Sequence, residues 1–150
     1  SWFGSRDGLL RAVIERNADG SAERVEAALD HAADPRQTLV AYGRGLLALL
    51  TSPGSIALNR AAMTDLDLAG LLLQSGRHRI GPVVERYLAG LHEQGTIHAP
   101  DPAAAYRLLY GLVVQDTQVR VLLGEPPPTA GEVETRAEAA VDSFLSLVTQ

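Results

Sequence analysis

The sequence predicts an all-α fold of a single domain. Apolar residues recur at the three- and four-residue spacing of amphipathic helices along nearly the whole chain. The alternating β-branched runs that mark strands are missing. With 150 residues, 46% of them hydrophobic and 21% charged, the chain has the size and balance of one soluble domain with a sizeable core.

Two helices are predicted before residue 34. Ser5 can cap the first, Asp7 lies in its positive first turn, and the segment "NADG" at 17–20 should end it. The second begins near Ser21 and stops at Asp34-Pro35. Their apolar stripes comprise Leu9, Leu10, Val13 and Ile14 in the first helix, and Val25, Ala28, Leu29 and Ala32 in the second.

A central helix should follow directly. Asp34 can cap it, Pro35 suits the first helical position, and Gln37 stands where a capping-box partner would reach back. The run 39–50 is apolar nearly all round, which predicts a helix buried on most sides until "TSPGS" at 51–55 ends it.

The middle of the chain predicts a short helix over 55–64 and a longer stretch over 67–92. Ser75-Gly76 and Gly81-Pro82 interrupt the longer stretch. Because Pro82 has no backbone donor, the stretch either kinks there or splits into two helices. Gly95 is expected to cap its C-terminal end.

The last third predicts two long helices, which brings the expected total to about seven. Asp101 and Pro102 start the first, and Gly124 stops it. Thr129 and Glu132 form a capping box at the start of the second. The apolar face of that last helix comprises Val133, Ala137, Ala140, Val141, Phe144, Leu145 and Val148.

Composition limits the class of function. The formal net charge is −5, so contact with nucleic acid must be local. The absence of cysteine rules out disulfides and thiolate chemistry and agrees with a cytoplasmic protein. The longest apolar runs are too short to span a bilayer, which takes about 20 residues.

No catalytic or metal-binding motif is evident. Asp65 and Asp67 are interpreted as helix-start residues rather than an acid/base pair, and the basic segment 77–79 as solvated. The histidines are scattered without a ligand-type partner at i+4: His31, His78, His92 and His98. We therefore expect no enzyme activity, no cofactor and no metal.

Polar and aromatic side chains embedded in apolar helices are the informative features. Such groups favour a small-molecule pocket, although each tyrosine taken alone could be an ordinary core ring with its hydroxyl at the surface. Asn59 and Met63 lie one turn apart on one helical face and make the better pair. The embedded residues are Tyr42, Asn59, Met63, Tyr87, Tyr106, Tyr110, Gln115 and Asp116.

The opening segment "SWFGSRDGLLRAV" resembles the junction that follows the recognition helix in TetR-family transcriptional regulators. Ser1 and Trp2 would end that helix or its connector. The residues that fit the junction pattern are Phe3, Gly4, Ser5, Arg6, Asp7, Leu9 and Leu10. The segments "LHEQGTIHAPDPAAAYRLLYGLVVQ" and "AEAAVDSFLSL" are similar to the AefR-like subgroup of the family.

The resemblance implies a cytoplasmic homodimer that acts as a ligand-responsive transcriptional regulator, expected to be a repressor. Residues 1–4 would be the remnant of a helix-turn-helix DNA-binding domain, the rest of which is missing from the 150 residues. Residues 5–150 would bind the ligand and form the dimer. Arg6, assisted by Ser5, would contact a DNA phosphate; the alternative is a solvated arginine beside a capping serine.

The resemblance also implies two sets of site residues. The ligand would be a hydrophobic or amphipathic small molecule, and its pocket would be lined by Tyr42, Leu46, Asn59, Met63, Tyr87, Leu91, Tyr110 and Val113. The last two long helices of each subunit would form a four-helix interface with Leu108, Leu112, Val119, Leu122, Val141, Phe144, Leu145 and Val148. The alternative is that these faces are buried inside one subunit.

Ligand binding would tilt the first helix, over 5–17, and change the spacing of two DNA-reading heads that must lie about 34 Å apart. Bulky residues at Asn59 or Met63 should then abolish the response. The alternative function is a stand-alone helical module that binds a small molecule or a protein and has no DNA activity.

Overall fold

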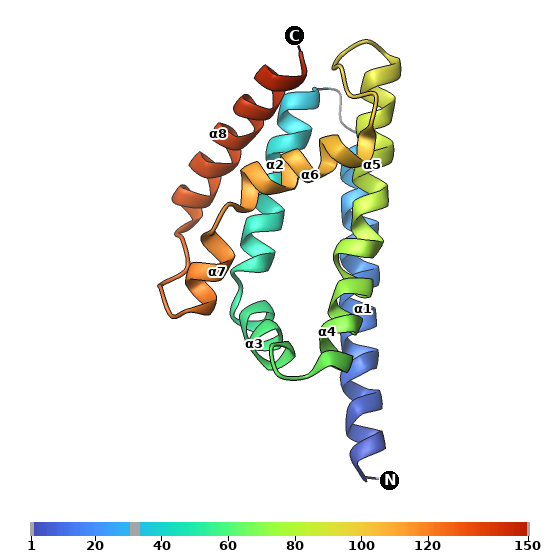
Figure 1. The fold of residues 1–150 in the computed structure, drawn as a ribbon, viewed down its shortest axis with the longest axis vertical. Helices are drawn as coiled ribbons and strands as arrows, with labels where there is room; N and C mark the ends of the chain where they lie inside the picture. Colours follow the sequence, from blue (N-terminus) through green and yellow to red (C-terminus); the bar gives the residue numbers. More distant parts are fainter. Residues whose placement is uncertain (1, 31–33, 150) are drawn as a thin grey trace.

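The computed structural model describes residues 2–30 and 34–149, and their side chains from residue 8 onward except residue 30. These residues form eight helices and no strand, so the predicted all-α class is confirmed. Helices α1, α4 and α5 run along one side of the molecule, α2 and α8 along the other, and α6 crosses between them near the chain's C-terminal end (Figure 1). The helices are α1 (Trp2–Asp30), α2 (Pro35–Leu50), α3 (Pro53–Ala62), α4 (Leu66–Ser75), α5 (Arg77–Glu93), α6 (Pro102–Val114), α7 (Thr117–Leu122) and α8 (Ala130–Val148).

Helix α1 is continuous, so the predicted break at 17–20 is wrong. Its buried residues include Ile14, Ala18 and Ala22, which follow one another at i, i+4 and i+8 across that segment. This stripe packs on α4 and α5. Burial of a continuous apolar stripe outweighs the cost of one glycine inside a helix, which is about 1 kcal/mol.

Helix α2 lies at the centre, as predicted. Asp34 caps it by accepting a hydrogen bond from the backbone N–H of Arg36, and Pro35 takes the first helical position. One face buries Leu39 and Leu47 completely against α6 and α8. The face toward α1 is only partly covered, and this difference creates the site described below.

The structure separates α4 from α5 at Gly76 and leaves Pro82 inside α5 without splitting it. The carbonyl that Pro82 leaves without a partner belongs to His78, and both residues are exposed to water. Water can therefore satisfy that carbonyl. Asp65 caps α4 by accepting from the backbone N–H of Leu68, in agreement with its interpretation as a helix-start residue.

The predicted helix from residue 101 to 124 is interrupted at Gln115, which has φ 47° and ψ −130°. No local glycine or proline signals this break. A tertiary contact fixes the following helix α7: the Arg60 side chain of α3 donates to the backbone carbonyls of Val121 and Leu122, each at 3.1 Å. Gly95 and the Thr129–Glu132 capping box end and begin their helices as predicted.

The core lies where α2, α5, α6 and α8 meet, and Phe144 is its largest fully buried side chain. None of the helices in the described ranges is long and apolar enough to cross a membrane.

Candidate functional site

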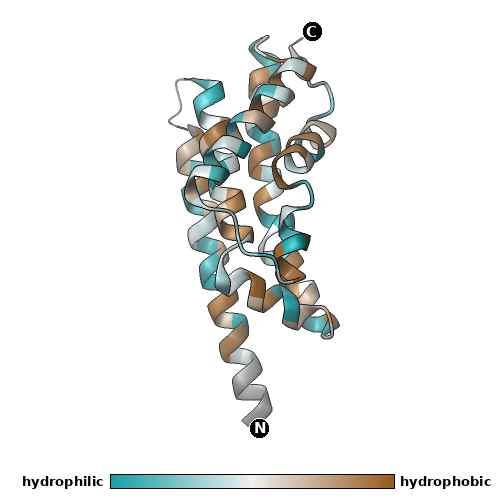
Figure 2. Cartoon of the chain, turned by 90° about the vertical axis from the view of Figure 1, so that its left-hand side faces the viewer, coloured by the Kyte–Doolittle hydropathy of each residue, from teal (hydrophilic) through white to brown (hydrophobic). Residues whose placement is uncertain are grey.

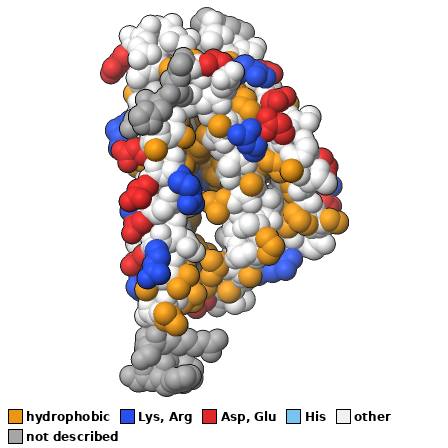
Figure 3. All heavy atoms as spheres, turned by 180° about the vertical axis from the view of Figure 1, so that it is seen from behind, with side chains coloured by type: hydrophobic (Ala, Val, Ile, Leu, Met, Phe, Trp, Pro, Cys, Tyr) orange, Lys and Arg blue, Asp and Glu red, His pale blue; other side chains and the backbone are white. Residues whose placement is uncertain are grey.

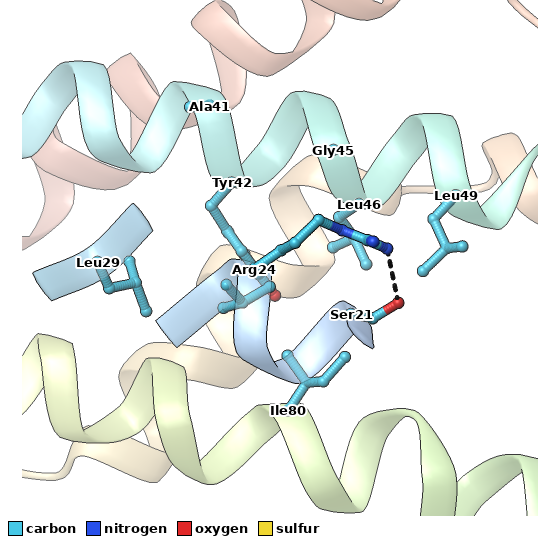
Figure 4. A pocket seen from close by; sticks show the side chains of 10 residues that line it. Ser21, Arg24, Leu29, Ala41, Tyr42, Gly45, Leu46, Leu49 and Ile80 are labelled. Atoms are coloured by element: carbon cyan, nitrogen blue, oxygen red, sulfur yellow. Dashed lines mark hydrogen bonds between the residues drawn. The ribbon is translucent and has the colours of Figure 1, made fainter. Parts of the chain in front are cut away.

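A cavity of about 230 Å³ lies between α1, α2 and α5. In the space-filling view, hydrophobic side chains gather around a hollow between the column of the molecule that contains α1 and the remainder (Figure 3). The three helices contribute side chains to it from facing directions (Figure 4). Its lining residues are Ser21, Arg24, Val25 and Leu29 of α1, Ala41, Tyr42, Gly45, Leu46 and Leu49 of α2, and Ile80 of α5.

The amphipathic pattern of α2 explains why the cavity exists. Leu39 and Leu47 face the core, Leu49 lies on the side toward α1, and Leu46 lies between these two sides, packed against the core and also lining the cavity. Gly45 has no side chain, and a Cβ added there would meet no atom within 4 Å. The apolar surface that α2 turns toward α1 is therefore only partly covered and lines the cavity.

Tyr42 supplies a buried polar group to the site. Among the described residues its hydroxyl has no hydrogen-bond partner within 3.5 Å, and Tyr106 is a polar neighbour close enough to influence its pKa. Burial raises the pKa of Tyr42 far above its usual value, and the neighbouring Tyr106 adds to this effect. The hydroxyl is therefore neutral at physiological pH and can donate one hydrogen bond and accept others. A buried hydroxyl without a partner costs roughly 1–3 kcal/mol, which a hydrogen-bonding ligand would recover.

A group of aromatic rings continues from Tyr42 toward α6. The ring centroids of Tyr106 and Tyr110 are 6.0 Å apart. The guanidinium of Arg77 lies 4.7 Å from the centroid of the Tyr110 ring, in cation–π geometry. Burial raises the pKa of both Tyr106 and Tyr110. The Tyr42 side chain opposes the rise of the Tyr106 pKa more than the charge of Arg77 does, while Arg77 alone opposes it at Tyr110.

Arg24 provides the cationic group of the site. Its side chain extends from α1 across the cavity, and Nη2 donates to the Ser21 hydroxyl at 3.3 Å (Figure 4). Arg24 is exposed and takes part in none of the ion pairs formed by the described residues. By contrast, Arg79 of α5 pairs with Asp19 of α1 and ties the two helices together next to the cavity.

Two of the predicted ligand-lining residues, Tyr42 and Leu46, line this cavity. Tyr110 lies in the adjoining aromatic group. Leu91 and Val113 are 5% and 2% exposed and belong to the core.

Three other predicted ligand residues lie outside the cavity. Tyr87 is half-buried beside Thr38, and burial raises its pKa. The Asn59 amide donates to the backbone carbonyl of Ser55 at 2.8 Å, so a local contact already occupies it. Met63 follows the end of α3 and is 68% exposed. Asn59 and Met63 therefore do not line the cavity between α1, α2 and α5.

Sequence reasoning missed Ser21, Arg24, Gly45 and Ile80. One signal was available for Arg24. Arg11 and Arg16 each have an acidic residue three or four positions away, whereas the corresponding neighbours of Arg24 are glycine, serine and alanine. An arginine on a helix in an acidic chain, with no acidic neighbour on its own face, is free to bind an external anion.

The predicted interface residues fall into three groups. Val141, Phe144 and Val148 are at most 7% exposed and pack into the chain's own core, as in the alternative that these faces are buried inside one subunit. Leu108 and Val119 are 38% and 54% exposed. The remaining three are half-buried: Leu112, Leu122 and Leu145.

The remaining candidates are the expected phosphate contacts and the histidines. The side chains of Ser5 and Arg6, the expected phosphate contacts, lie outside the described residues, as does His31. His92 accepts a hydrogen bond at Nδ1 from the backbone N–H of Ala99 at 3.0 Å. Within the described ranges, no group of three or more His, Asp or Glu side chains is placed to hold a metal ion.

Comparison with known proteins gives consistent results. Residues 37–147 match the family described as AefR-like transcriptional repressor, C-terminal domain. A TetR transcriptional regulator from Agrobacterium tumefaciens is similar at 35% identity and a TM-score of 0.74, over 98% of this chain and 74% of that one. A protein from Mesorhizobium loti described as a TetR-family transcriptional regulator has the same fold, with 22% identity and a TM-score of 0.81, over 93% of this chain and 73% of the other. No curated protein sequence matches the chain.

Proposed function

Since this chain belongs to the TetR family of transcriptional regulators, in its AefR-like branch, we propose that it is the ligand-binding and dimerisation domain of a ligand-responsive repressor. The observation that carries the proposal is the cavity between α1, α2 and α5, which α1 lines with its C-terminal half. A hydrophobic or amphipathic small molecule bound there would contact the helix that leads to the N-terminus.

The continuity of α1 supports a mechanical link. A helix of 29 residues is about 44 Å long. Its C-terminal half carries Ser21 and Arg24 at the cavity, and its N-terminal half reaches the start of the chain. A ligand that shifts the C-terminal half would move the N-terminal half with it, as one body. A differential ligand affinity of about 1–3 kcal/mol for two positions of α1 would change DNA affinity roughly 5- to 150-fold.

The N-terminal part of α1 is suited to hold another domain. Figure 1 shows it extending beyond the other helices, and Figure 2 shows hydrophobic residues along its coloured part. Leu9 and Val13 are 67% and 46% exposed. We propose that a helix-turn-helix headpiece preceding this domain packs here, with residues 1–4 as its end and with Ser5 and Arg6 touching a DNA phosphate. Because the net charge of the chain is −5, most of the affinity for DNA would come from that headpiece.

The proposed homodimer forms through α6 and α8. Leu108 of α6 and Leu147 of α8 are 38% and 57% exposed on helices that pack against each other. Together with the half-buried Leu112 and Leu145, they supply apolar surface that two copies could join into a four-helix bundle. We propose a cytoplasmic regulator without enzyme activity and without a cofactor.

The first experiment is to sequence the coding region upstream of Ser1. We expect a basic helix-turn-helix there, and full-length protein that binds the DNA flanking its own gene more tightly than unrelated DNA at the same salt concentration. A start codon at this position, or equal affinity for the two DNAs, would overturn the regulator and favour the stand-alone ligand-binding module.

The cavity itself is tested with 1-hexanol, a neutral amphipathic probe. Ligand binding to the folded state raises the unfolding temperature. We expect 1-hexanol to raise it for the wild type and not for Gly45→Leu, in which the new side chain fills the cavity. Gly90→Leu is the matched control, because it also adds a side chain where no atom lies within 4 Å of the Cβ, outside the cavity. Equal responses of the wild type and Gly45→Leu would contradict the proposed site.

A further inference from the structure

We propose that the ligand of this cavity is a small amphipathic organic acid, whose carboxylate is held by Arg24 and whose apolar body carries a hydrogen-bonding oxygen that reaches Tyr42. The proposal rests on the proposed function, because it assumes that the cavity between α1, α2 and α5 is the ligand site.

The charge of the site selects the anion. Arg24 crosses the cavity, and its one hydrogen bond, to the Ser21 hydroxyl, leaves most of its five N–H donors available. Among the described side chains that line the cavity, none is acidic. The positive charge of Arg24 beside an apolar cavity disfavours cationic ligands, although the chain as a whole has a net charge of −5. The planar guanidinium can donate two parallel hydrogen bonds to a carboxylate.

The apolar lining limits the anion to one charged end. Between Arg24 and the far wall, the side chains that face the cavity are aliphatic, chiefly Leu29, Leu46 and Ile80. A second charge placed among them would lose its hydration without compensation. The ligand is therefore charged at one end and apolar along its body.

Tyr42 adds a second point of recognition. Its hydroxyl is buried and unpartnered, so an entirely hydrocarbon body would leave it unsatisfied. A ligand oxygen within hydrogen-bond reach would remove that cost. Analogues that lack this oxygen should bind more weakly, because the Tyr42 hydroxyl would then stay unpaired in the bound state.

The size of the cavity sets the size of the acid. The cavity volume of about 230 Å³ lies below the roughly 300–1,000 Å³ of sites that hold drug-sized ligands. This volume suits a compact acid with one ring or a short chain, with its carboxylate at the open, Arg24 side.

Three probes test the proposal by calorimetry on the full-length protein. 3-Phenylpropanoate carries the charge, 3-phenylpropanamide is its neutral counterpart, and 3-(4-hydroxyphenyl)propanoate adds an oxygen at the apolar end. We expect the acid to bind about 10-fold more tightly than the amide, in line with a charge-assisted hydrogen bond at a partly exposed site. We expect the added hydroxyl to gain a further factor of about 3 to 10.

Two variants assign these gains to their residues. Arg24→Gln should weaken binding of the acid more than binding of the amide and so remove the preference for the acid, whereas Arg16→Gln, on the same helix but outside the cavity, should retain the preference. Tyr42→Phe should remove only the gain from the added hydroxyl.

Equal affinity for acid and amide, or an equal loss of both in Arg24→Gln, would overturn the proposed acid. So would the absence of binding of all three probes up to their solubility. The response to 1-hexanol does not depend on charge, so a cavity filled by 1-hexanol together with no preference for the acid would reject this inference and retain the proposed function.

Discussion

Arg36 of α2 and Asp142 of α8 form a two-pronged ion pair, with Nε–Oδ1 at 2.8 Å and Nη2–Oδ2 at 3.1 Å. A second pair, Arg44 with Glu134 at 2.7 Å, joins the same two helices. Both pairs are exposed, so they orient α8 on α2 more than they stabilise it. The stabilisation comes from the buried residues between the helices.

The Arg36–Asp142 pair predicts a small stability loss that depends on pH and salt. The Arg36 guanidinium lowers the pKa of Asp142 below its usual 3.8, so the pair stabilises the fold above that pH and is lost as the pH falls through the lowered pKa. Arg36→Gln should therefore lower the urea midpoint at pH 7 and low salt. The difference should shrink as the pH falls through the lowered pKa of Asp142, and it should vanish in about 1 M salt. An identical loss in Arg107→Gln, an exposed arginine that forms none of the ion pairs among the described residues, would contradict this assignment.

Gly43 and Gly45 should respond differently to alanine, although both lie in α2. Alanine gains about 0.5–1 kcal/mol over glycine inside a helix. At Gly45 the new methyl meets no atom within 4 Å, so Gly45→Ala should be stabilised by about that amount. At Gly43 it would lie 3.3 Å from a Val113 methyl, so Gly43→Ala should be less stable than Gly45→Ala by about 1–3 kcal/mol. Urea unfolding measures both, and equal stabilities would mean that α2 is packed differently from the structure.

Phe144→Ala should destabilise each subunit by about 3–5 kcal/mol, because Phe144 is fully buried in the core of its own chain. The loss should be the same at low protein concentrations, where the protein is a monomer, and at high concentrations, where the proposed dimer forms. A loss that appears only at the high concentrations would mean that Phe144 lies at the subunit interface.

Leu147→Arg should dissociate the proposed dimer without unfolding the subunit. Leu147 is 57% exposed on α8, so arginine costs little within the chain, while two copies would place like charges against each other in the bundle. Sedimentation should show a monomer with an unchanged helical spectrum. Leu73→Arg, at an exposed leucine of α4, is the matched control and should leave the oligomeric state unchanged.

Substitution at Met63 should not affect the cavity. Met63 is 68% exposed and lies outside it, whereas Leu46 lines it. Met63→Trp should keep the affinity for 1-hexanol within about twofold, and Leu46→Trp should lower it at least tenfold, because only the second ring occupies the cavity. Isothermal calorimetry on the two variants gives the comparison, and loss of binding in Met63→Trp would point to a site on α3.

Local chemistry made much of the fold predictable. Asp34 and Asp101 cap their helices before a proline, and Thr129 forms its capping box with Glu132, since these contacts involve residues only two or three positions apart. The apolar face of α8 was likewise correct, because burial follows the helical period. The continuity of α1 and the break at Gln115 were not predictable, since the first depends on packing against α4 and α5 and the second on the α3–α7 contact.

The sequence by itself determined the helical class, most helix ends and the resemblance to one family, because these depend on residue order at short range. Only the tertiary structure decided which side of each helix was left uncovered. It placed Leu46 and Tyr42 at a cavity, kept Met63 in solvent, and turned Phe144 inward. It also brought Arg24 to the cavity, whereas the sequence showed only that this arginine has no acidic residue three or four positions away. The physical reason is that an apolar stripe specifies burial but not the partner that buries it, and the partner is set by how the helices pack.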